Sequence, residues 1–211
     1  MNPVRVSCEG VSIASLAIPP FRLQTGTLVC LHMPGPACSE EEEQVIQALT
    51  GKRQVPGLYL FGRVAWARPA RPLRVGLFGL FSQDRSDDWL VRAAGVSRAE
   101  AGAVLARLGL RPTWAIRHLP LTPTTLLGLE AAWAGGAEAL VFLTAGLDPS
   151  GREAVYQSVA ARLGQCAAIH LSYPFLQNGQ KQRSCLPTAH CIEVKRQCAS
   201  PTSLAAGKGR A

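Results

Sequence analysis

The sequence predicts an α/β fold, built on a mostly parallel sheet with an N-terminal antiparallel β subdomain and a short helical insertion. Three observations predict it. Strand-like segments joined by turns fill the first 33 residues. Strand-like and helix-like segments then alternate, which is typical of a parallel sheet. Between them, at about 84–120, Ala, Leu and Arg recur at helical spacing.

The N-terminal segment is expected to form several short strands. Residues 4–18 alternate in polarity and are rich in Val and Ile, and Pro19-Pro20 and Thr25-Gly26 then interrupt the pattern. An apolar run follows at 27–33. These features predict strands joined by tight turns.

A helix is predicted directly after the apolar run. The chain turns at Pro34-Gly35-Pro36, and Ser39 with Glu42 three residues later forms a capping-box pattern that opens a helix to about residue 50. A strand, a tight turn and a helix in this order are the opening of a phosphate-binding loop fold.

The middle of the chain is predicted to contain two short strands followed by a helical insertion. Two strand-like pieces are predicted at 57–62 and 74–81, separated by a hairpin or loop rich in Pro and Arg. The helical insertion at about 84–120 contains a second capping-box pattern, formed by Ser97 and Glu100.

The C-terminal half continues the alternation. Helices are predicted at 124–134 and 150–163, strands at 139–143 and 167–172, and a further strand at about 191–194. The composition of residues 199–211 predicts a disordered basic tail. We therefore expect one domain over 1–198.

Composition limits the function classes. No stretch approaches the roughly 20 apolar residues that a membrane-spanning helix needs, and the N-terminus has no secretory pattern. Seven cysteines, an odd number, argue against a disulfide framework. We expect a cytoplasmic protein. The formal charge of +8 is compatible with an acidic partner, an anionic lipid or nucleic acid, and equally with simple solubility.

Several segments resemble motifs of the ATP-binding-cassette (ABC) transporter ATPases, in the family's order. The six residues from Thr144 to Pro149 resemble the D-loop, and Gln83 falls at the Q-loop. The run from Leu105 to Leu110 resembles the segment before the signature motif. The resemblance covers nearly the whole chain and implies a P-loop NTPase-like fold. It also implies contact surfaces at Gln83 and at the D-loop residues Gly146, Leu147 and Asp148.

The chain departs from the family at the phosphate-binding loop. The matching stretch runs from Gly35 through Ser39 to Glu42, so that Glu40, Glu41 and Glu42 replace the second Gly, the Lys and the hydroxyl residue. In the family the loop amides and the Lys hold the phosphates and the hydroxyl binds magnesium. By the resemblance, Gly35 and Ser39, together with Gln83 at the Q-loop, would be vestiges of the nucleotide site. Carboxylates at the helix start would instead repel a triphosphate.

The other motifs of the family are damaged as well. The strand at 139–143 lacks the Asp and Glu that would hold magnesium and polarise water. The signature corresponds to the stretch from Leu121 to Thr125, without its glycines. The switch His falls near Tyr173, and we interpret His170 as an ordinary strand residue.

The favoured interpretation is a degenerate, non-hydrolysing ABC protein without catalytic residues or a bound cofactor. It would act as an accessory or interaction subunit beside a permease or an intact ATPase subunit, with a dimer and a peripheral position at the inner face of the membrane as further possibilities. The first alternative is an ATP-binding ABC ATPase with an aberrant loop, which would use ATP and magnesium.

The second alternative is a basic nucleic-acid-binding relative. It is based on a basic, aromatic loop and a basic C-terminal end, which contain Arg63, Arg68, Arg71 and Arg74 with Trp66, and Lys195, Arg196, Lys208 and Arg210. We judge nucleic acid the less favoured partner, because solvated loop charges are the commoner explanation. A zinc site formed by Cys185, His190, Cys191 and Cys198 is disfavoured. The set contains no CxxC pair, and His190 and Cys191 would point to opposite faces of a strand. No metal site is therefore predicted.

Overall fold

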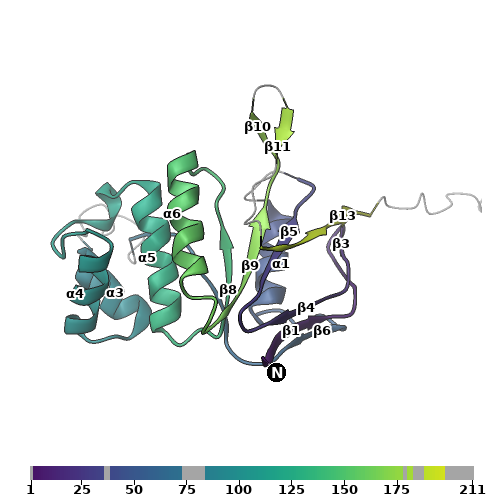
Figure 1. The fold of residues 1–211 in the computed structure, drawn as a ribbon, viewed down its shortest axis with the longest axis horizontal. Coiled ribbons are helices and arrows are strands. Elements are labelled where there is room, and N and C mark those ends of the chain that lie inside the picture. The colour runs from purple at the N-terminus through teal and green to yellow at the C-terminus, as the bar shows by residue number, and fades with distance from the viewer. Residues whose placement is uncertain (1, 36–38, 73–83, 178–179, 183–187, 198–211) are drawn as a thin grey trace, which may run out of the picture.

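The computed structural model describes residues 2–35, 39–72, 84–177, 180–182 and 188–197. In Figure 1, the helices α3 to α6 lie on one side of the central strands, and α1 and the N-terminal strands lie on the other. Among the described residues, no helix is long and apolar enough to span a bilayer.

A five-stranded parallel sheet forms the centre of the molecule, in the order β12-β5-β9-β8-β7. Its three inner strands are β5 (Leu28–His32), β9 (Ala167–Ser172) and β8 (Ala139–Leu143). They are buried almost throughout, as parallel strands covered on both faces are. The edge strands are β12 (His190–Glu193) and β7 (Val64–Trp66). The predicted α/β class with a mostly parallel sheet is confirmed.

Helices cover both faces of this sheet. On one face, Val29, Leu31 and Ile169 share a core with Val45 and Leu49 of α1 (Glu40–Leu49). On the opposite face, alternate residues of the same strands pack against α5 (Leu121–Ala134) and α6 (Pro149–Ala160). The period of two along each strand separates the two cores.

The N-terminal strands form the predicted antiparallel β subdomain. β1 (Val4–Cys8) pairs with β4 (Phe21–Gln24) on one side and with β6 (Leu58–Leu60) on the other. A second small sheet contains β2 (Val11–Ile13), β3 (Leu16–Ile18) and β13 (Lys195–Arg196). The buried faces of these strands join the α1 core.

The helical insertion contains α3 (Ser86–Ala94), α4 (Arg98–Arg107) and the 3-10 turn η1 (Ile116–His118). Their apolar side chains form a third core with Leu127 and Ala131 of α5. Both hydrogen bonds of the Ser97/Glu100 capping box are present, as predicted.

The structure corrects several element boundaries. The segment predicted as a loop or hairpin after residue 62 contains the strand β7, which is too short at three residues to show a periodic pattern. Helix α5 begins at Leu121 rather than at 124, and α6 ends at Ala160 rather than at 163. The hairpin of β10 (Phe175–Gln177) and β11 (Gln180–Gln182) was not predicted. The tail at 199–211 and the whole of the strand expected at 74–81 lie outside the described residues.

Candidate functional site

The order of the strands defines where a ligand would bind. From β5 the chain crosses to β7 at one edge and returns through β8 to β9, and it then passes over to β12 on the other side of β5. β5 and β9 are therefore neighbours at the point where the order reverses. In open α/β sheets, ligands bind beyond the carboxyl ends of strands at such a point. Here this place holds the loop after β5, the start of α1 and the end of β9.

The first turn of α1 is acidic and capped by its own serine. The Ser39 hydroxyl accepts a hydrogen bond from the backbone N–H of Glu42 at 3.1 Å. Four consecutive glutamates, Glu40 to Glu43, make up the first turn. The partial positive charge of the helix start thus faces carboxylates of the same chain. This capped acidic helix start agrees with the interpretation from the sequence.

Glu42 differs from its neighbours because it is buried, with 5% of its surface exposed. The hydroxyl of Tyr173, in the residue that follows β9, donates a hydrogen bond to Oε2 of Glu42. Buried carboxylates are stable only when such donors compensate for lost water. The carboxylate of Glu42 is therefore held against Tyr173, the residue near which the switch His was predicted to fall.

Arg196 lies beside the same helix start. Its guanidinium lies 2.8 Å from the carboxylate of Glu41, and a Cβ placed on Gly35 would lie 3.2 Å from the same guanidinium. Ser15 also donates a hydrogen bond to Glu41. The Ser15 hydroxyl, followed by Arg196, holds the pKa of Glu41 below its usual value, so this carboxylate is charged at neutral pH.

The end of β8 carries a hydroxyl in place of a carboxylate. Thr144 follows β8, and its Oγ1 lies 3.0 Å from Nε2 of His170. His170 is fully buried on β9, stacked on Phe142 and touched edge-on by Tyr156. Burial, and secondarily the charge of His32, lower the pKa of His170 to about 3. His170 is thus a neutral strand residue, as interpreted from the sequence.

The D-loop-like residues support the fold locally. Gly146 adopts a left-handed conformation with φ of 82°, and Leu147 is buried in the core under α5 and α6. Asp148 caps α6, accepting a hydrogen bond from the N–H of Gly151 at 2.6 Å. The hydrogen bond from the Gly151 N–H, followed by the one from the Ser150 hydroxyl, lowers the pKa of Asp148. A role of the three residues in a protein interface stays a prediction.

The structure describes the stretch that resembles the signature motif but not the predicted Q-loop residue. Gln83 lies outside the described residues. The stretch from Leu121 to Thr125, matched to the signature motif, forms the first turn of α5, where the Thr124 and Thr125 hydroxyls both donate to the Leu121 carbonyl. These two hydroxyls are thus hydrogen-bonded within the helix.

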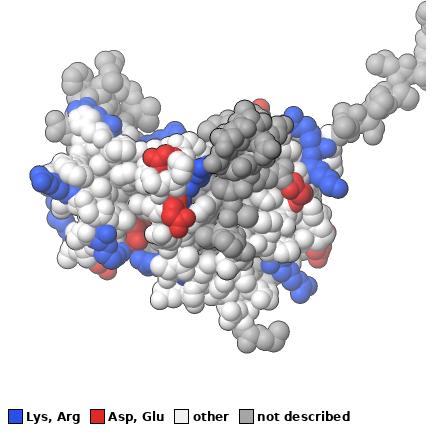
Figure 2. Space-filling model, turned by 45° about the horizontal axis from the view of Figure 1, so that its top comes forward, with Lys and Arg blue, Asp and Glu red and all other residues white. Residues whose placement is uncertain are grey.

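The basic side chains do not gather into one surface on the face shown in Figure 2, where acidic side chains lie among them. Several described arginines are paired: Arg92 with Asp84 at 2.6 Å, and Arg107 with Glu130 at 2.8 Å. Arg63, from the predicted basic stretch, donates to the carbonyl of Gly135. Arg74 of the same stretch lies outside the described residues, and the nucleic-acid alternative stays a prediction.

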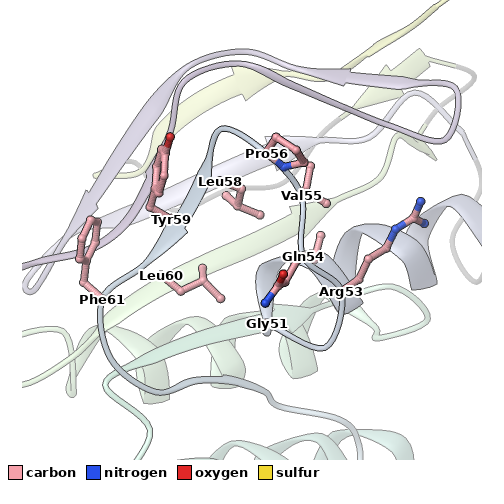
Figure 3. A pocket seen from close by; sticks show the side chains of 10 residues that line it. Gly51, Arg53, Gln54, Val55, Pro56, Leu58, Tyr59, Leu60 and Phe61 are labelled. Atoms are coloured by element: carbon pink, nitrogen blue, oxygen red, sulfur yellow. The ribbon is translucent and has the colours of Figure 1, made fainter.

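A separate pocket of about 540 Å³ lies at the other end of α1. Figure 3 shows Leu58 and Leu60 turned toward the loop that contains Gly51 and Gln54, with Tyr59 and Phe61 turned away from them. Tyr59 and Phe61 are about half exposed. Since α1 has ten residues and rises 1.5 Å per residue, this pocket is about 15 Å from the acidic turn and is not part of that site.

Comparison with known proteins identifies the architecture. No protein-family model and no curated protein sequence matches the chain. Solved structures do match. One is described as an inward-facing metal-chelate-type ABC transporter, with 11% identity, a TM-score of 0.63, and coverage of 87% of this chain and 83% of that chain. Another is an ATP-binding subunit of an ABC transporter, with 14% identity, a TM-score of 0.57, and coverage of 87% and 90%.

A third match is described as an ABC transporter ATP-binding protein from Pyrococcus furiosus. It is 13% identical, with a TM-score of 0.63, and the alignment covers 90% of this chain and 97% of that chain. At identities this low the likeness concerns the fold. It extends over most of both chains, so the antiparallel subdomain and the parallel sheet are matched together.

Proposed function

We propose that this chain, which has the fold of an ABC ATPase domain, does not bind or hydrolyse ATP and acts instead through protein contacts in a transporter system. One observation carries the first part of the proposal. The buried carboxylate of Glu42, hydrogen-bonded to Tyr173, stands at the helix start where the phosphates would lie. A phosphate placed there would meet the acceptor oxygens of a carboxyl group that is buried and held by Tyr173, where a loop amide or a Lys would be needed to bind it.

The surrounding residues support the same conclusion. Glu41 is ionised and paired with Arg196 beside Gly35, so this cation already has an anionic partner. Thr144, at the end of β8, offers a hydroxyl that lies within hydrogen-bond distance of His170. Neither Thr144 nor His170 is a carboxylate of the kind that binds magnesium or polarises water in ATP hydrolysis.

Thermal unfolding with nucleotide tests the first part. A ligand at about 100 times its Kd stabilises a protein by about 2.7 kcal/mol, which corresponds to roughly 5–10 °C in Tm for a chain of this size. We expect no shift with millimolar Mg-ATP or Mg-ADP, measured beside an intact cassette ATPase as positive control. A saturable shift of several degrees would refute the proposal and favour an ATP-binding protein with an aberrant loop.

The second part, an accessory role, is supported by the likeness to transporter ATP-binding proteins. We expect the chain, tagged and purified from its own cells in mild detergent, to bring down an ABC permease or an intact cassette ATPase in stoichiometric amount. Purification as an isolated chain from both the membrane and the soluble fraction would contradict the accessory role. It would leave the nucleotide result unaffected.

A further inference from the structure

Three sulfur and imidazole ligands converge at the edge of the parallel sheet formed by β5 and β12. Cys30 and His32 are two residues apart on β5 and so lie on the same face. Cys191 on β12 is the direct neighbour of Cys30 in the parallel register. The ligand atoms of the three residues all lie within 4.8 Å of one another. The sequence alone did not suggest this set, because Cys191 is 161 positions from Cys30.

We propose that Cys30, His32 and Cys191 form a Zn²⁺ site that joins β12 to β5. Two thiolates and an imidazole are typical ligands of zinc. With Zn–S near 2.3 Å and Zn–N near 2.0–2.1 Å, tetrahedral coordination places neighbouring ligand atoms about 3.6 Å apart. The Cys30 sulfur already lies 3.8 Å from Nδ1 of His32, so small rotations of the side chains bring both to one ion.

The burial of the three ligands fits a site that is closed on the protein side. Cys30 is fully buried and His32 is 7% exposed, whereas Cys191 is exposed. An ion can therefore enter from solvent past Cys191. Glu193 is the neighbour of His32 in the register, two residues beyond Cys191 and on its face of β12. A water or the Glu193 carboxylate would complete four-coordination.

A second layer of contacts holds the first ligand in place. Nδ1 of His170 lies 3.5 Å from the Cys30 sulfur, and Nε2 of the same ring lies 3.0 Å from the Thr144 hydroxyl. A hydrogen bond from an imidazole N–H to a ligating sulfur orients the thiolate and stabilises its charge. Because its other nitrogen is engaged by Thr144, His170 supports the site without being a fourth ligand.

The site has a structural consequence. β12 is an edge strand near the end of the described chain, and it leads through Val194 to β13, where Arg196 contacts Glu41. A metal clamp between β12 and β5 would therefore fix the segment that brings Arg196 over the first turn of α1. Binding energy of this kind contributes directly to folding stability.

Metal content and cobalt spectroscopy test the site on the full-length protein. The protein is stripped with a chelator under a non-thiol reductant, dialysed, and reconstituted with Zn²⁺ or Co²⁺. We expect one zinc per chain, a rise in Tm on adding zinc, and the absorption bands of tetrahedral thiolate-bound Co²⁺. Failure of the wild-type protein to take up zinc under reductant would overturn the proposal, as would a disulfide between Cys30 and Cys191 that persists under reductant.

Two neighbouring residues on β12 provide the test variant and its control. Cys191→Ser removes an exposed ligand with little risk to folding, and we expect it to weaken zinc binding at least about tenfold. His190→Ala changes an exposed residue on the other face of the same strand and should bind zinc like the wild type. If His190→Ala and Cys198→Ser lose zinc while Cys191→Ser keeps it, the site lies elsewhere and the proposal is wrong.

Discussion

The hydroxyl of Tyr173 donates a hydrogen bond to the carboxylate of Glu42, and this bond joins the end of β9 to the first turn of α1. The two residues are 131 positions apart in the chain. They meet where an α/β sheet of this order would hold a ligand. The contact brings Glu42 into the folded interior, whereas Glu40 and Glu43 of the same turn are exposed.

Tyr173→Phe is expected to destabilise the protein, because it removes a donor and leaves a buried carboxylate less satisfied. A loss of about 1–3 kcal/mol in the free energy of unfolding follows from the cost of such groups, measured by urea denaturation. Tyr59→Phe is the matched control, since Tyr59 is 47% exposed and its hydroxyl should contribute less than about 0.5 kcal/mol. Equal losses in the two variants would show that the Glu42 contact contributes nothing.

The difference between local and long-range information explains what the sequence could predict. The apolar run before Pro34 and the Ser39 cap lie within a few residues of each other, and they located β5 and α1 to within one residue. The short strand β7 has too few residues for a period. The contacts of Glu42 with Tyr173 and of Cys30 with Cys191 depend on strand register, which no local pattern encodes.

Gly128→Ala is expected to destabilise the fold although Ala favours helices. A Cβ at Gly128 on α5 would overlap the backbone carbonyl of Arg68, which cannot rotate away. We expect a loss of more than about 2 kcal/mol, by analogy with other overpacked core sites. Gly102→Ala is the control, because there the same substitution is expected to raise the free energy of unfolding.

Gly102 lies inside α4, and a Cβ there would meet no atom within 4 Å. Replacement by Ala should therefore gain up to about 1 kcal/mol from helix propensity. Thermal and urea denaturation of both variants measure the difference. A stabilised Gly128→Ala variant would mean that α5 and the segment after β7 are not in close contact.

Leu147→Ala tests whether the D-loop-like segment is structural. Leu147 is 8% exposed and packs in the core under α5 and α6, so its truncation should cost about 2–4 kcal/mol. Leu121→Ala, at a residue 43% exposed, should cost less than about 1 kcal/mol. If Leu147→Ala left the isolated chain as stable as wild type but weakened a complex with a partner, the interface role predicted for it would be favoured.

The burial of His170 predicts a specific pH dependence of stability. The pKa of His170 is about 3 in the folded protein against an ordinary 6.5, so below pH 6.5 the unfolded chain binds a proton that the folded chain does not. The stability that the neutral ring contributes is complete above pH 6.5 and is lost as the pH falls toward 3, by up to about 1.4 kcal/mol per pH unit.

His170→Phe should flatten this dependence, because Phe keeps an aromatic ring beside Phe142 and Tyr156 but binds no proton. The free energy of unfolding is measured from pH 7 to pH 4 in both proteins, with a chelator present so that metal binding does not contribute. The free energy of unfolding of the wild type should fall relative to that of the variant as the pH decreases, because only the wild type must keep a buried imidazole neutral. If the free energies of unfolding of the two proteins changed in parallel from pH 7 to pH 4, His170 would take up its proton in the folded state as it does in the unfolded chain. That would require water or an anion to reach the centre of the sheet.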